Sequence, residues 1–130
     1  MVSKYPKKDL ALRTRQFGLR VIRLVDTLPR RKSATVIGRQ LLRSATSVGA
    51  NYRAATRGRS RPDFTAKLGI AVEEADESLY WLELILEAGL VSAPKINGLI
   101  DEAHQLVAIL TSSIKTVKTN NAMSATNSKF

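Results

Sequence analysis

The 130-residue sequence contains no cysteine, a single histidine and only 5% aromatic residues. Without cysteine, the chain can form neither a disulfide scaffold nor a thiolate metal site, and it has no thiol nucleophile. Asp101 and His104 have the spacing at which bundle helices present metal ligands, but a di-metal site needs a second carboxylate–histidine helix. No nucleophile or second base accompanies the other carboxylates. We therefore expect no catalytic residue, no metal and no cofactor.

Long apolar runs are also missing. None approaches the roughly 20 residues that a membrane-spanning helix requires. The first eight residues, MVSKYPKK, are basic and lead into a charged segment rather than into the apolar core of a secretion signal. We expect a cytoplasmic protein with no membrane partner.

No stretch of five or more residues alternates in the manner of a β-strand, whereas apolar residues recur every three or four positions almost throughout. This period predicts an all-α protein. The expected helices cover about residues 9–28, 34–57, 61–88 and 93–118. Short connections between long helices favour antiparallel neighbours, and hence an up-down-up-down four-helix bundle. We expect residues 1–8 to be a flexible basic arm, residues 9–118 to be the bundle, and residues 119–130 to be a disordered polar tail.

Local residue types predict several of the helix ends. Pro29 closes the first helix. Ser33 is the expected N-cap of the second, and Ser60 with Asp63 has the spacing of a capping box at the start of the third. Gly89 has the place of a left-handed glycine after a helix.

Acidic residues are scarce in the first half of the chain. Residues 1–62 hold sixteen Lys and Arg against Asp9 and Asp26, while residues 63–130 hold five Lys and Arg against nine Asp and Glu. The net charge of the whole chain is +10. Such asymmetry suggests a polyanionic partner, or two halves that face each other between helices or subunits.

The second predicted helix combines positive charge with very small side chains. At 100° per residue, Arg39, Arg43, Arg53 and Arg57 fall within about 40° of one line. Residues 44–50 are mostly Ser, Ala, Thr and Gly, although a helical glycine costs about 1 kcal/mol relative to alanine. Three interpretations stay open: close approach of another helix, a ligand that approaches the backbone, or a solvated basic face with incidental small residues.

The third predicted helix carries a complementary acidic face. Its members are Glu73, Asp76, Glu77, Tyr80, Glu83 and Glu87. Pairing of this face with the arginines would set register more than stability, because surface ion pairs contribute only about 0 to 1 kcal/mol. Tyr80 and Trp81 could stack on bases, but we expect at least one of them to pack in the core or in an interface.

Three segments carry a family resemblance: QLLRSATSVGANYRAA at residues 40–55, DFTAKLGIA at 63–71 and EEADESLYWLEL at 73–84. In this order they resemble the bacterial four-helix-bundle proteins encoded within intervening sequences of 23S ribosomal RNA genes. The resemblance covers about residues 10–118 and implies an antiparallel bundle that assembles as a ring-shaped homopentamer. The accessory proteins of diversity-generating retroelements, which are similar in fold, are basic, pentameric partners of a reverse transcriptase that bind nucleic acid. No catalytic set is implied.

With this resemblance, we expect the oligomer interface to use the small-residue block and part of the acidic helix. The candidate interface residues are Ser44, Ser47, Gly49, Ala50, Asn51, Tyr52, Glu77, Tyr80 and Trp81.

Two functions follow from these features. The first is a non-enzymatic, oligomeric protein that binds nucleic acid, RNA in particular, by electrostatic and sequence-tolerant contacts. Its candidate binding residues are Arg39, Arg43, Arg53, Arg57, Arg59 and Arg61, with Arg30, Arg31 and Lys32 as a second patch. The alternative is an oligomeric protein-interaction scaffold, in which the arginines form intersubunit salt bridges with Glu77, Glu83 and Glu87.

Overall fold

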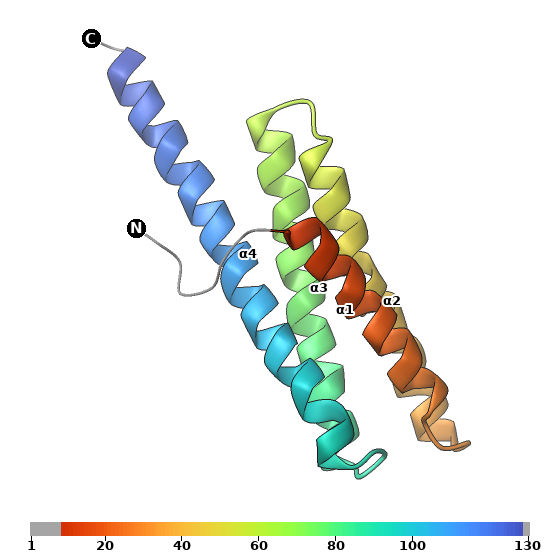
Figure 1. The fold of residues 1–130 in the computed structure, drawn as a ribbon. Helices are drawn as coiled ribbons and strands as arrows, with labels where there is room; N and C mark the ends of the chain where they lie inside the picture. Colours follow the sequence, from red (N-terminus) through yellow and green to blue (C-terminus); the bar gives the residue numbers. More distant parts are fainter. Residues whose placement is uncertain (1–8, 129–130) are drawn as a thin grey trace.

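The chain folds into four α-helices that pack as an antiparallel bundle, as the computed structural model shows in Figure 1. The structure describes the backbone of residues 9–128 and the side chains of residues 9–119. The helices are α1 (Leu10–Asp26), α2 (Lys32–Thr56), α3 (Arg61–Glu87) and α4 (Ala93–Ser128). The expected all-α, up-down-up-down architecture is confirmed. The predicted basic arm at residues 1–8 lies outside the described residues.

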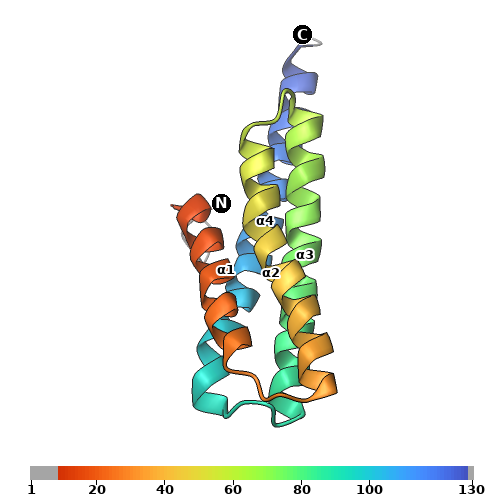
Figure 2. The same ribbon diagram turned by 90° about the vertical axis from the view of Figure 1, so that its right-hand side faces the viewer.

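Helix α2 lies between α1 and α3, while α4 packs on α3 and also contacts α1. Helix α1 has only 17 residues and α2 has 25, so α1 covers only part of its neighbour. Figure 2 shows the last turns of α2 and the first turns of α3 extending beyond the start of α1. Helix α1 therefore leaves the last turns of α2 uncovered on this side of the bundle.

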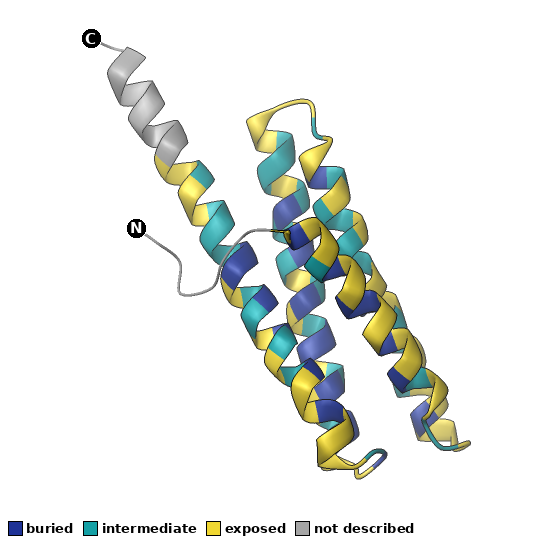
Figure 3. Cartoon of the chain, in the orientation of Figure 1, coloured by how far each residue is buried: buried dark blue, intermediate teal, exposed yellow. Residues whose placement is uncertain are grey.

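The core is built from the apolar stripes that the helical period predicts. Buried positions follow the inward side of each helix (Figure 3). Burial of these side chains is the main stabilising contribution, at about 25 cal/mol for each Å² of apolar surface removed from water. The largest fully buried apolar side chains are Phe17, Val21, Leu41, Val48, Leu68, Leu82, Ile85, Ile96, Leu106, Ile109 and Leu110.

The predicted ends of α3 are confirmed. The Ser60 hydroxyl accepts a hydrogen bond from the backbone N–H of Asp63 at 3.2 Å, and Pro62 lies in the first turn. After the helix, Gly89 adopts a φ of 68°, a conformation that glycine tolerates without strain. The N–H of Leu90 donates to the Ile85 carbonyl oxygen at 3.0 Å and closes the last turn.

The predicted start of α2 is wrong. Arg31, in extended conformation, is the N-cap, and its side chain makes no capping hydrogen bond. Its backbone carbonyl accepts from the N–H of Thr35 at 3.0 Å, so Ser33 already lies inside the first turn. The N–H of Arg31 donates to the Pro29 carbonyl oxygen at 2.9 Å. This backbone turn starts the helix at Lys32, so no serine side chain caps its first turn.

The predicted disordered tail at residues 119–130 is corrected for residues 119–128, because α4 continues to Ser128, while residues 129–130 lie outside the described residues. The sequence holds no proline or glycine after Gly98, so nothing in it breaks the helical backbone. With 36 residues, α4 is about 54 Å long at 1.5 Å per residue. The fading of the apolar stripe therefore does not mark the end of the helix.

Candidate functional site

The arginines predicted to form one stripe on α2 face different neighbours. Arg43 lies on the α3 side, where its guanidinium donates to Glu74 at 2.9 Å and also to Glu77. The indole N–H of Trp81 donates to the same Glu77 carboxylate at 3.0 Å. Arg43 is thus paired within its own chain, which corrects both its expected availability to nucleic acid and the expected intersubunit pairing of Glu77.

The charges in this cluster stabilise one another. The hydrogen bond to Glu77 is the largest influence that raises the pKa of Arg43. The hydrogen bond from Trp81, followed by that from Arg43, lowers the pKa of Glu77 below its ordinary value. Both groups therefore stay charged at neutral pH. Because half of the Arg43 side chain is exposed, we expect the cluster to orient side chains rather than to supply much stability.

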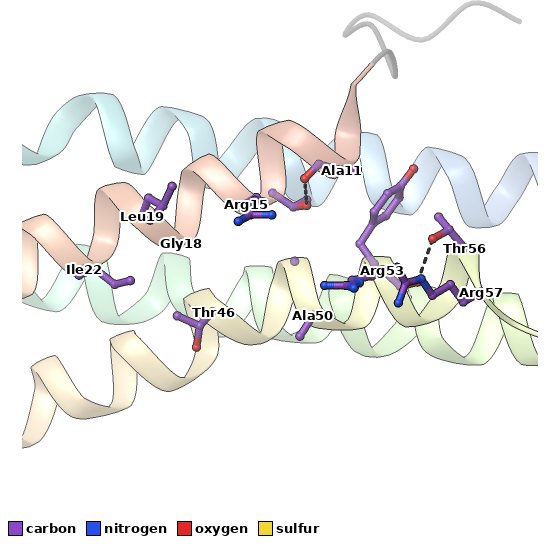
Figure 4. A pocket seen from close by; sticks show the side chains of 13 residues that line it. Ala11, Arg15, Gly18, Leu19, Ile22, Thr46, Ala50, Arg53, Thr56 and Arg57 are labelled. Atoms are coloured by element: carbon purple, nitrogen blue, oxygen red, sulfur yellow. Dashed lines mark hydrogen bonds between the residues drawn. The ribbon is translucent and has the colours of Figure 1, made fainter.

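Arg53 and Arg57 lie on the other side of α2, along a groove between α1 and α2 (Figure 4). The groove has a volume of about 710 Å³. Helix α1 contributes Arg15, Leu19 and Ile22 to its lining. A second, smaller groove of about 340 Å³ lies beside Arg30 and Arg39 at the opposite end of the α1–α2 pair.

Small residues allow α1 and α2 to approach closely at the base of the groove. A Cβ atom on Gly49 would lie 3.4 Å from the backbone carbonyl of Thr14, and one on Gly18 would lie 3.8 Å from the Ala45 carbonyl oxygen. Of the three interpretations of the small-residue block, close helix approach is the one seen, and it occurs inside the chain. Gly49 therefore packs against α1 of its own chain, and not against another subunit as the sequence predicted.

Ser44 is fully buried between α2 and α3. Its hydroxyl accepts a hydrogen bond from Ser78 at 3.0 Å and donates to the Leu41 carbonyl oxygen at 3.2 Å. A side chain that is fully buried within one chain has no surface left for a neighbouring subunit. The interface prediction for Ser44 is therefore wrong.

The other predicted interface residues keep some exposure. Ala50 and Tyr80 are exposed, whereas Tyr52 and Trp81 are half-buried against the core. The Tyr80 and Trp81 rings meet edge to face, with centroids 5.0 Å apart. The expectation that one of the two aromatic residues packs inward is thus confirmed for Trp81. Ser47 and Asn51 are half-buried and donate to backbone carbonyls of α2, at 2.7 and 2.9 Å.

Most of the remaining arginines are exposed and available. Within the part of the chain that the structure describes, nine exposed arginines have side chains that make no hydrogen bond or ion pair: Arg15, Arg20, Arg23, Arg30, Arg31, Arg39, Arg53, Arg57 and Arg59. Arg61 and Lys32 are exposed as well. The three α1 residues of this set are absent from the sequence-based candidates, although the scarcity of acidic residues before position 62 could have indicated them.

Arg13 differs from these exposed arginines, because its guanidinium donates to Glu102 at 2.7 Å and to Gln105 at 3.0 Å.

The opposite charge gathers on α3. Among the described residues, Glu73, Asp76, Glu83 and Glu87 are exposed and their carboxylates have no hydrogen-bonding or ionic partner. Over the same residues, no group of three or more His, Asp or Glu side chains could hold a metal ion. Helices long and apolar enough to cross a bilayer are likewise absent from the described chain. The molecule thus has a basic α1–α2 side and an acidic face on α3.

Comparisons with known proteins agree with this architecture. The profile of the 23S rRNA-intervening sequence protein family matches residues 8–112. A crystal structure of a protein of unknown function from the S23 ribosomal protein family of Bacteroides thetaiotaomicron is 34% identical in sequence, with a TM-score of 0.76. The match covers 81% of this chain and 97% of that one. No curated protein matches the sequence. The chain belongs to the 23S rRNA-intervening sequence protein family.

Proposed function

We propose that this protein binds RNA, without catalysing a reaction, through the basic side formed by α1, α2 and the loops that flank α2. The observation that carries the proposal is the set of nine exposed arginines whose side chains have no partner within the described chain. Guanidinium groups bind phosphate oxygens in a bidentate manner, and each contact releases counterions from the nucleic acid. An RNA backbone supplies many phosphates at once, so an array of free arginines suits it better than it suits a single small anion.

The contacts in this proposal are electrostatic and tolerate different sequences. The arginines are spread over two helices and two loops, an arrangement that follows a backbone rather than reading base edges. We place the protein in the cytoplasm, where ribosomal RNA is found. We further propose that the chain assembles as a homopentamer, as the family resemblance implies. Repetition of the basic side around a ring would multiply a modest phosphate affinity through several simultaneous contacts.

Size-exclusion chromatography with light scattering tests this function. The full chain is run with a structured RNA at low and at high salt, alongside a variant that combines Arg53→Gln and Arg57→Gln. We expect an oligomer that elutes with RNA at low salt and releases it at high salt. We expect the variant to form an oligomer of the same mass as the wild type but to bind less RNA. An oligomer that ignores RNA at both salt concentrations would rule out the proposal.

A second candidate function is a protein-interaction scaffold in which copies contact one another through opposite charges. The observation in its favour is the acidic face of α3, where Glu73, Asp76 and Glu83 surround the exposed side chains of Ile70 and Tyr80. This face is opposite in charge to the basic end of the α1–α2 groove, at Arg53 and Arg57. Two different surfaces in contact give a head-to-tail interface, which closes as a ring when the rotation permits.

The scaffold function predicts a change in mass. Glu73→Lys combined with Glu83→Lys should dissociate the oligomer in light scattering, because like charges would then face each other across the interface. The matched control is Asp101→Lys on α4, which is exposed and lies outside the acidic face. An unchanged mass for the double variant would exclude this head-to-tail contact.

A further inference from the structure

The groove between α1 and α2 is divided into an apolar part and a basic part. Figure 4 shows Leu19, Ile22 and Thr46 toward one end, and Arg53 and Arg57 toward the other. Arg15 lies between them, one turn before Leu19 on α1. The exposed fractions of Leu19 and Ile22 are 43% and 39%, which is high for large apolar side chains that face a groove. The groove thus presents an apolar surface next to a cluster of positive charge.

The walls of the groove carry no negative charge. Its lining contains three arginines and no Asp or Glu. Tyr52 is the one aromatic ring in the lining, and burial raises the pKa of its phenol above the ordinary value. The ring therefore stays neutral and does not repel an anion. The close approach of α1 and α2 at Gly18 and Gly49 leaves backbone and small side chains at the base, which creates room for a flat ligand.

We infer that this groove holds a short unpaired segment of the bound RNA, with one base against Leu19 and Ile22 and the phosphates of this nucleotide and the next at Arg53 and Arg57. The inference rests on the RNA-binding function proposed above. A nucleotide has a flat, weakly polar base at one end and a phosphate at the other, which matches the division of the groove. The volume of about 710 Å³ lies within the usual range of small-ligand sites, roughly 300 to 1,000 Å³.

The distribution of charge favours a nucleotide over the acidic face of a second copy. On α3 the exposed carboxylates from Glu73 to Glu87 extend over about 21 Å at 1.5 Å per residue. They would need cations along the whole groove, but the apolar end between Leu19 and Thr46 offers none. Ala50 and Tyr52 line the groove, so the inference places them in an RNA-binding site. The sequence had predicted both residues at an oligomer interface.

A preference for single strands follows. A base can enter the groove only when it is free of its partner strand, since paired bases remain within the stack. Stacking of one base on an aromatic side chain contributes about 1 to 3 kcal/mol. For the aliphatic contacts with Leu19 and Ile22 we expect the lower end of this range, which is about tenfold in affinity. Duplex RNA would reach only the arginines outside the groove.

The test compares two fluorescent RNA probes, a 15-nucleotide single strand and a blunt 15-base-pair duplex, by anisotropy with the full chain at one salt concentration. Ala50→Leu narrows the groove without changing charge, and Ala108→Leu is the matched control at an exposed site on α4. We expect the wild type to bind the single strand about tenfold more tightly, and Ala50→Leu to remove this preference while leaving duplex binding intact. The control should behave as the wild type. Leu19→Gln, which removes part of the apolar wall, provides a second variant if Ala50→Leu does not fold.

The outcomes separate the inference from the proposed function. Equal binding of both probes, or an undiminished preference in both groove variants, would overturn the nucleotide site while RNA binding stands. Loss of oligomer mass in Ala50→Leu with unchanged RNA affinity would assign the groove to a second copy instead. Absence of binding to either probe by the wild type would remove the proposed function and the inference together.

Discussion

At the scale of single residues, Arg43 and Arg53 show how position on one helix decides the role of an arginine. Arg43 is held by Glu74 and Glu77, whereas the Arg53 side chain has no partner in the described chain. Arg53→Gln should therefore weaken RNA binding about fivefold, since an exposed charged contact is worth about 1 kcal/mol. Arg43→Gln should weaken it less than twofold by the same argument. Anisotropy titrations of both variants test this, and a larger loss for Arg43→Gln would contradict the assignment.

The carboxylate of Glu77 offers a second test at this scale. Its pKa is lowered chiefly by the hydrogen bond from Trp81, so any stability from this bond is present at neutral pH and is lost as the pH falls through the folded-state pKa. Trp81 is the only tryptophan, so fluorescence reports on this site alone. We expect its emission to change with a midpoint below 4.5, the ordinary glutamate value. Glu77→Gln should abolish the transition and Glu83→Gln should leave it; a midpoint at or above 4.5 would be evidence against the bond.

At the scale of the helices, the two serines predicted as caps differ in their effect. Ser60→Ala removes the hydroxyl that caps α3 and should lower the free energy of unfolding by about 1 kcal/mol. Ser33→Ala should leave it unchanged or raise it slightly, because Ser33 lies inside the first turn of α2, where alanine is the better helix former. Denaturant unfolding followed by circular dichroism measures both. Equal losses for the two variants would contradict the observed start of α2.

The helices were predictable because burial depends on a period that the sequence displays. Phe17, Leu41 and Leu106 all lie where the apolar stripes place them. Helix ends were less predictable: Ser60 and Gly89 carry local signals that nothing overrides, whereas α2 begins from a backbone turn at Pro29 without any side-chain cap.

The candidate site was predictable in composition but not in arrangement. Arg43 and Arg53 lie about 80° apart on a helical wheel, at opposite edges of the predicted stripe, and α3 flanks one of them whereas α1 flanks the other. That difference depends on which helices pack beside α2, and the periodicity of α2 alone does not contain this information. For the same reason, Ser44 and Gly49 were assigned to a contact between subunits although their partners, Ser78 and Thr14, lie in the same chain.

At the scale of the whole molecule, the central claim is that the basic α1–α2 side binds RNA phosphates. The most direct test measures the affinity for a single-stranded RNA at a series of salt concentrations, for the wild type and for the Arg53→Gln, Arg57→Gln double variant. We expect affinity to fall steeply with salt, and the logarithmic slope to become shallower by about 0.7 for each arginine removed. A wild-type affinity that does not depend on salt, or a double variant with the wild-type slope, would contradict the account.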